Sequence, residues 1–166
     1  QKDLVINLKI EKSVPAMIVL DKDKLAQIFF NIIGNAVKFS KKGGRIDVII
    51  SGELIFTKNL ILTCTVKDNG VGISKDKIPQ LIKPFTQASQ ASNGDYKGTG
   101  LGLAIASKLI ELMGGVLHIE SEIDQGSTFT FALISQASEQ KLNLLSNTAQ
   151  KNENLAIENL ADKHPL

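Results

Sequence analysis

The fold of this chain depends most on the stretch LAQIFFNIIGNAVKFS, residues 25–40. Its apolar residues recur every three or four positions, at Leu25, Ile28, Phe29, Ile32, Ile33, Ala36 and Val37. This spacing places them on one face of an amphipathic helix that packs against a core. Asp21 is a suitable N-cap before the helix, and Gly43-Gly44 follows its end.

Strand-like runs flank this helix, and they occupy residues 5–10, 16–20, 45–56, 60–67, 116–121 and 128–134. The first run alternates polar and apolar residues, as a half-buried strand does. The middle two and the last two runs are joined by short turns, so each pair predicts an antiparallel hairpin. In the second turn, Gly126 is available for a positive φ.

Two further helices complete the predicted elements. Ser74 is expected to cap a short helix that runs through Ile82, and helical spacing returns from Leu101 to Met113. Together the elements predict an α/β (α+β) two-layer sandwich, in which a mixed, largely antiparallel sheet of about five strands packs on a layer of about three helices.

Composition excludes several classes of protein. The chain has 166 residues, 43% apolar and 22% charged, which fits a soluble globular domain. Its 19 basic and 17 acidic residues give no strong field, so we expect no nucleic-acid partner and no direct membrane contact. No apolar run approaches the roughly 18–20 residues of a membrane span, and residues 1–12 lack the apolar stretch of a signal peptide. Cys64 is the only cysteine, and we expect a buried small hydrophobe there.

The composition changes near the C-terminal end of the chain. Residues 136–166 contain no aromatic residue and no glycine, and are rich in Asn, Gln, Glu and Lys. We therefore expect a domain over residues 1–135 and a polar tail or linker over 136–166; a helix docked on the domain is the alternative.

The polar residues of the first long helix form the first candidate site. Asn31, Asn35 and Lys38 fall within a sector of about 60°, away from the apolar stripe. They could be an ordinary solvated face, but Asn is a poor residue for a helix interior. An Asn oxygen suits Mg²⁺ and a lysine suits phosphate, so the three could hold a metal–triphosphate unit.

Two glycine-bearing segments extend this candidate site. Asp68 ends an apolar strand ahead of Gly70 and Gly72; it could merely stabilise a turn, or accept a hydrogen bond from the exocyclic amine of a flat base. The segment from Gly98 to Leu103 opens the last helix and is a candidate phosphate cradle. It matches neither the Rossmann fingerprint nor the P-loop, and alone it is weak support.

Five segments in order resemble the N, G1, F, G2 and G3 boxes of the ATP-binding catalytic domain of sensor histidine kinases. They are NIIGNAVKFS at 31–40, DNGVGI at 68–73, PFTQ at 84–87, GTGLGL at 98–103 and GSTF at 126–129. The resemblance covers roughly residues 1–135 and implies the Bergerat ATP-binding fold, with Mg-ATP held between the N-box helix and a lid.

By this resemblance each box contributes residues to the ATP site. Asn35 would ligand Mg²⁺, Asn31 and Lys38 would face the phosphates, and Phe39 would pack near the adenine. Asp68 would bind the adenine amine, and the rest of the base pocket would come from Gly70, Gly72, Ile73 and Thr128. Phe85 would anchor a lid over residues 86–99. The phosphates would be held by Gly98, Thr99, Gly100, Leu101, Gly102 and Leu103, and Lys97 is the cation nearest the lid tyrosine, Tyr96.

The resemblance also implies the reaction and the partners. Related ATPases place a glutamate base at the first N-box position, whereas this chain has Asn31, which cannot take a proton. We therefore expect a protein-histidine kinase domain that transfers the γ-phosphoryl group to a histidine on a separate dimerisation segment. His118 and His164 do not match the context of that histidine. A response regulator or fused receiver domain would be the downstream partner.

We further expect a cytoplasmic, monomeric fragment that binds nucleotide but does not autophosphorylate alone. The alternative is a degenerate nucleotide-binding or interaction module of the same fold without transfer activity.

Overall fold

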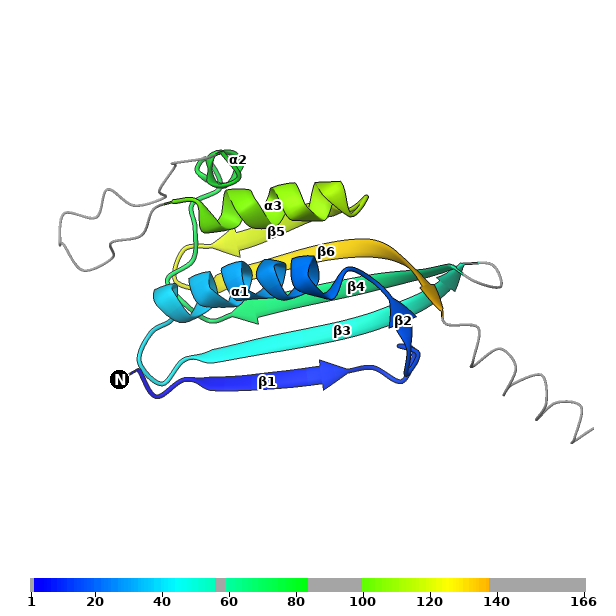
Figure 1. Ribbon diagram of the computed structural model, residues 1–166. Helices are drawn as coiled ribbons and strands as arrows, with labels where there is room; N and C mark the ends of the chain where they lie inside the picture. The colour runs from blue at the N-terminus through cyan, green and yellow to red at the C-terminus, as the bar shows by residue number, and fades with distance from the viewer. Residues whose placement is uncertain (1, 56–58, 84–99, 138–166) are drawn as a thin grey trace, which may run out of the picture.

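A computed structural model describes residues 2–55, 59–83 and 100–137 of the chain. The elements follow in the order β1 (Val5–Ile10), β2 (Ile18–Val19), α1 (Lys22–Phe39), β3 (Arg45–Ile55), β4 (Asn59–Asp68), α2 (Ile78–Leu81), α3 (Gly102–Leu112), β5 (Val116–Glu122) and β6 (Gly126–Ala137). Helices α1 and α3 lie side by side on one face of a six-stranded sheet (Figure 1). The predicted two-layer sandwich is confirmed, with six strands in place of about five.

The sheet is mixed and largely antiparallel, as predicted. Its main order is β1-β3-β4-β6-β2, and β5 also pairs with β6, along the first part of that long strand. Only β1 and β3 run parallel among the described pairs. The register places Asp68 opposite Ile46 on one side and Ser127 on the other. The end of β4 and the start of β6 therefore lie next to each other, at the same end of these two neighbouring strands.

Helix α1 begins and ends as its sequence predicts. Asp21 is the N-cap, and its Oδ1 accepts a hydrogen bond from the Lys24 amide at 3.0 Å. At the other end, the Ser40 hydroxyl donates to the Ala36 carbonyl at 2.6 Å. The buried face of the helix, formed by Ile28, Ile32 and Ala36, packs on the sheet.

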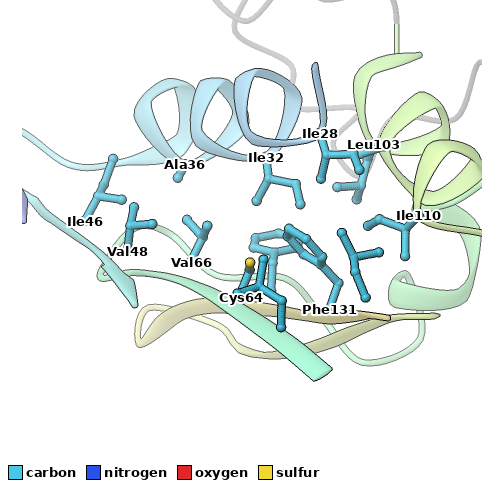
Figure 2. Packing of buried hydrophobic residues seen from close by; sticks show 14 of the residues in the cluster. Ile28, Ile32, Ala36, Ile46, Val48, Cys64, Val66, Leu103, Ile110 and Phe131 are labelled. Atoms are coloured by element: carbon cyan, nitrogen blue, oxygen red, sulfur yellow. The ribbon is translucent and has the colours of Figure 1, made fainter. Parts of the chain in front are cut away.

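The core lies between the helices and the inner face of the sheet (Figure 2). Alternate residues of β4 are buried there, which are Leu60, Leu62, Cys64, Val66 and Asp68. Phe131 from β6 meets Phe29 edge to face, with ring centroids 5.6 Å apart. Cys64 is fully buried, and burial raises the pKa of its thiol to about 12, so it serves as a small apolar residue, as expected.

Strand β1 differs from its prediction. Its alternation predicts a half-buried strand, but all six of its residues are exposed. The register puts Ile6 and Leu8 on the same sheet face as the buried Ile46 and Val48 of β3. Figure 1 shows the reason: β1 lies at the outer edge of the sheet, and α1 covers the strands further in.

The short helix α2 also differs from its prediction. It begins at Ile78 rather than after Ser74, and its N-cap, Lys77, makes no side-chain capping bond. A turn over residues 75–77, in which the Lys77 amide donates to the Ser74 carbonyl at 3.0 Å, separates Ser74 from the helix, so Ser74 is not at the N-cap position. The Ser74 hydroxyl donates to the carboxylate of Asp76.

Strand β6 continues to Ala137, where its last two residues pair with β2. The predicted domain boundary at residue 135 thus falls inside this strand. The rest of the predicted tail lies outside the described residues, and its role as a linker stays a prediction. Within the ranges described, no helix has the length and apolarity needed to cross a membrane.

Candidate functional site

The polar face of α1 meets the start of α3 at Asn31. A Cβ placed on Gly102 would lie 3.4 Å from Asn31 Oδ1. Asn31 Nδ2 is buried and has no hydrogen-bond partner among the residues that the structure describes. Leaving a buried amide donor unsatisfied costs about 1–3 kcal/mol, so an acceptor supplied by a ligand would be stabilising here.

Asn35 and Lys38 follow on the same face of α1 and are half-buried. Lys38 Nζ lies 5.1 Å from the centroid of the Phe39 ring, within the range of a cation–π contact. The backbone carbonyl of Phe39 accepts a hydrogen bond from the Val71 amide at 3.2 Å. The C-terminal end of α1 is thereby joined to the turn that follows Asp68.

Asp68 ends β4 on the core side of the sheet and is 4% exposed. Its Oδ1 accepts a hydrogen bond from the Gly70 amide at 2.8 Å. Burial raises the pKa of Asp68 above its ordinary value, and backbone hydrogen bonds from Gly70 and Ser127 oppose part of that rise. A buried carboxylate of this kind is stabilised by a further hydrogen-bond donor such as an amine.

The glycines of this turn are required by packing. A Cβ on Gly70 would lie 2.5 Å from the Phe39 carbonyl oxygen, which is too close. Gly72 has φ +68°, and its Cβ would lie 1.9 Å from the Glu122 carbonyl oxygen. The turn is therefore held between the end of α1 and the β5–β6 turn, a constraint that exists without any bound base.

Ser121 and Ser127 take part in this site, although neither is a sequence-predicted site residue. Ser121 Oγ accepts a hydrogen bond from the Ile73 amide at 2.8 Å and lies 2.9 Å from Ser127 Oγ. Ser127 is buried, and it pairs with Asp68 in the sheet.

The structure does not bring the predicted Thr128 to this site. Thr128 pairs with the exposed Lys67, on the opposite sheet face from Asp68, because side chains alternate along a strand. Ser127 could have been identified from the sequence, because residues 127, 129 and 131 alternate along β6 and the apolar Phe129 and Phe131 indicate the buried face.

The second glycine segment opens α3. Gly100 has φ +69°, and Leu101 is the N-cap residue without a side-chain capping bond. Leu103 is buried in the core. Its part in a phosphate cradle is therefore limited to the backbone, whose amides at the start of an 11-residue helix suit an anion.

Four predicted site residues lie outside the described residues. They are Phe85, Lys97, Gly98 and Thr99, and the predicted lid over residues 86–99 lies there too. Their roles stay predictions.

The described residues fit a magnesium nucleotide by their chemistry. Within those ranges no group of three or more His, Cys, Asp or Glu side chains could hold a metal ion by itself. An amide oxygen on α1, from Asn35, is the type of single protein ligand that Mg²⁺ accepts when phosphate oxygens and water complete its shell. The Asn31 amide, whose Nδ2 has no partner among the described residues, and the Lys38 ammonium are donors for those phosphates.

Known proteins resemble this chain in sequence. Residues 20–137 match the family described as histidine kinase-, DNA gyrase B- and HSP90-like ATPase. The chain is 37% identical over 131 residues to the autoinducer 2 sensor kinase/phosphatase LuxQ of Vibrio vulnificus, covering 77% of the chain and 15% of that protein. It is 37% identical over 153 residues to histidine kinase 5 of Arabidopsis thaliana, covering 80% and 17%. The chain thus spans less than a fifth of the length of these relatives.

Solved structures share the fold. Full-length ShkA in complex with AMPPNP matches with a TM-score of 0.63 and 30% identity, covering 82% of this chain and 27% of that one. The mycobacterial sensor histidine kinase MprB also matches with a TM-score of 0.63, at 23% identity, covering 82% and 85%. By its sequence and its fold, this chain belongs to the histidine kinase-, DNA gyrase B- and HSP90-like ATPase family, as a catalytic domain of the sensor histidine kinase type.

Proposed function

We propose that this domain binds Mg-ATP with the adenine at the Asp68 turn and the phosphates between α1 and the start of α3. One observation carries the proposal: α1 contacts both places, through Phe39 at Gly70 and through Asn31 at Gly102. A single rigid helix would therefore fix the distance between the base and the phosphates.

The described residues of the site divide the proposed binding roles among them. Asp68 accepts a hydrogen bond from the exocyclic amine of adenine, Asn31 and Lys38 donate to phosphate oxygens, and Asn35 is the protein ligand of Mg²⁺. The metal ion, when bound, neutralises charge on the phosphates. Gly100 and Gly102 allow the backbone to approach them. Lys97, Gly98 and Thr99 would add to this binding, as their sequence predicts.

The proposed reaction moves the γ-phosphoryl group to an imidazole nitrogen of a histidine on a dimerisation segment. A nitrogen–phosphorus bond forms, the bond from γ-phosphorus to the bridging oxygen breaks, and its electron pair leaves with ADP. The attacking nitrogen uses its lone pair, and the proton on the other ring nitrogen passes to a base or water beside that histidine. Asn31 cannot accept a proton, which favours transfer over activation of water for hydrolysis.

The partners are proposed on the same basis. The histidine-bearing segment would belong to the full-length protein, with a response regulator or fused receiver domain downstream; one relative is named a hybrid signal transduction protein, dokA of Dictyostelium discoideum. Because ATP is the substrate, we place the domain in the cytoplasm, where a monomer is sufficient to bind nucleotide.

Calorimetry with the isolated chain tests binding. We expect Mg-ATP to bind, chelation of Mg²⁺ to weaken it, and Asn35→Asp to change the Mg²⁺ dependence more than the fluorescence of a bound adenine analogue. The absence of binding at saturating Mg-ATP would contradict the proposal.

Labelled ATP and an added histidine-bearing segment then test transfer. Phosphohistidine on that segment supports the kinase. Binding without phosphohistidine would indicate the degenerate module, and steady phosphate release by this chain alone would indicate an ATP-hydrolysing domain instead.

A further inference from the structure

The segment that leads into β1 is fastened to the C-terminal turn of α1 by one side chain. Lys2 Nζ donates to the backbone carbonyls of Lys38 at 2.5 Å, Ser40 at 3.1 Å and Val37 at 3.3 Å. Carbonyls at the end of a helix lack partners within the helix, and they carry its negative dipole charge. The Lys2 ammonium therefore acts as a cap on α1.

The backbone on both sides holds this lysine in place. The Gly43 amide donates to the Lys2 carbonyl at 2.8 Å, and the Val5 amide donates to the Gly44 carbonyl at 2.9 Å. Leu4 packs against the core between them. Lys2 is half-buried, so fewer conformations are open to its side chain than to a lysine on the surface.

The capped turn also supports the base side of the candidate site. Phe39 lies between two of the residues whose carbonyls Lys2 binds, and its own carbonyl accepts from the Val71 amide at 3.2 Å. The missing Cβ of Gly70 is what allows that carbonyl to come close. A shift of this turn would therefore move the loop after Asp68.

We propose that Lys2 is a positioning residue of the nucleotide site, because it fixes the end of α1 against which the Asp68 turn is built. The inference rests on the proposed function and adds a residue that acts on the site through the backbone of α1. Removing the ammonium would free three carbonyls, let the last turn of α1 fray, and weaken nucleotide binding from a distance.

The test compares four variants of the chain by calorimetry with Mg-ATP and Mg-ADP, at a temperature at which circular dichroism shows each one fully folded. Lys2→Met removes the ammonium and keeps the length of the side chain, while Lys2→Arg restores a cationic donor. Lys9→Met removes an exposed lysine of β1 whose described partner is Glu11. Ser135→Ala removes a buried hydrogen bond to Val19 at the far end of the sheet, as a control for lost stability.

We expect Lys2→Met to raise the Kd roughly threefold to tenfold, with Lys2→Arg close to the original chain and both controls unchanged. The factor should be similar for ADP and ATP, because a lost long-range charge would affect the more highly charged ATP more. Hydrogen exchange of the Val71 amide, measured without ligand, should become faster in Lys2→Met alone.

The possible failures are distinguishable. If the original chain binds no nucleotide, the proposed function fails and the positioning role fails with it. If the original chain binds and Lys2→Met binds equally well, only the inference about Lys2 is overturned. An equal loss in Ser135→Ala, or a loss confined to ATP, would also overturn it, in favour of general stability or of charge.

Discussion

The two ends of the candidate site along α1 differ in how completely their polar groups find partners: the base end lies at the C-terminus of the helix, and the phosphate end lies at its middle, around Asn31. At the base end, the amides of Gly70, Val71 and Ile73 all have partners within the protein. At the phosphate end, Asn31 Nδ2 is buried without a partner among the described residues, and Leu101 lacks a side-chain cap. The base end is preorganised and adds little ordering cost to binding, whereas the phosphate end has donors that a ligand would satisfy.

The largest effect is expected on stability, when the Asp68 turn at the base end is disrupted. Gly72→Ala places a Cβ 1.9 Å from the Glu122 carbonyl oxygen at a φ of +68°. Strain and overpacking together should lower the free energy of unfolding by about 3 kcal/mol or more, as measured by urea denaturation. A loss below about 1 kcal/mol would mean that the turn is not rigid.

Gly34→Ala is the matched control for Gly72→Ala. Gly34 lies within α1, and a Cβ there meets nothing within 4 Å. Alanine should raise the free energy of unfolding by up to about 1 kcal/mol through helix propensity. If Gly72→Ala lowers the free energy of unfolding and Gly34→Ala raises it, the loss at Gly72 comes from the packing of the Asp68 turn. Replacing a glycine with alanine would not by itself cause it.

The next effect concerns the carboxylate at the base end. Asp68→Asn keeps an oxygen for the Gly70 amide but loses the charge, so we expect the free energy of Mg-ATP binding to weaken by about 1–3 kcal/mol in calorimetry. Unchanged affinity would contradict the proposed adenine position.

Asp68→Asn should weaken binding but increase stability, and the gain in stability should depend on pH. Burial raises the pKa of Asp68 above its ordinary 3.8, so the folded state holds its proton more tightly than the unfolded state does. The ionised side chain therefore lowers stability above its folded pKa, and Asp68→Asn should be the more stable protein there. As the pH falls below 3.8 the difference should vanish, which denaturation at several pH values can check.

Much of this contrast could be predicted from the sequence. The apolar period of residues 25–37 located α1, and Asp21 located its first turn, because both signals are local. The sequence places Asn31 and Asn35 on one helical face, but it does not reveal that Nδ2 of Asn31 has no hydrogen-bond partner among the residues that the structure describes. That property depends on how closely α3 approaches, at Gly102.

Other features depend on neighbours that a local pattern does not report. Alternation in β1 predicts two unlike faces, but whether a helix covers one of them is decided by where α1 packs. The family resemblance predicts Thr128 in the base pocket, but the pairing of β6 with β4 turns it to the other sheet face. The predicted capping role of Ser74 is wrong because a turn over residues 75–77 separates it from the first helical residue, Ile78.

A smaller effect on stability and on nucleotide binding is expected at the phosphate end. Asn31→Leu removes a buried amide whose Nδ2 is unsatisfied among the described residues, so the ligand-free protein should gain about 1 kcal/mol in thermal or urea unfolding. Binding of Mg-ATP should weaken in the same protein. If stability falls instead, the amide has a partner in the folded protein and the contrast between the two ends is wrong.

The smallest effect is expected at the rim of the base end, where Lys41 and Asp124 form an exposed ion pair at 3.1 Å. Such pairs contribute about 0–1 kcal/mol, and the Asp124 amide holds the Val71 carbonyl at 2.8 Å whether or not the ion pair is present. Lys41→Met should therefore change stability and nucleotide affinity no more than Lys108→Met, which breaks a similar exposed pair on α3. A clearly larger loss at Lys41 would mean that surface charge, and not the backbone bonds of the turn, gives the base end its rigidity.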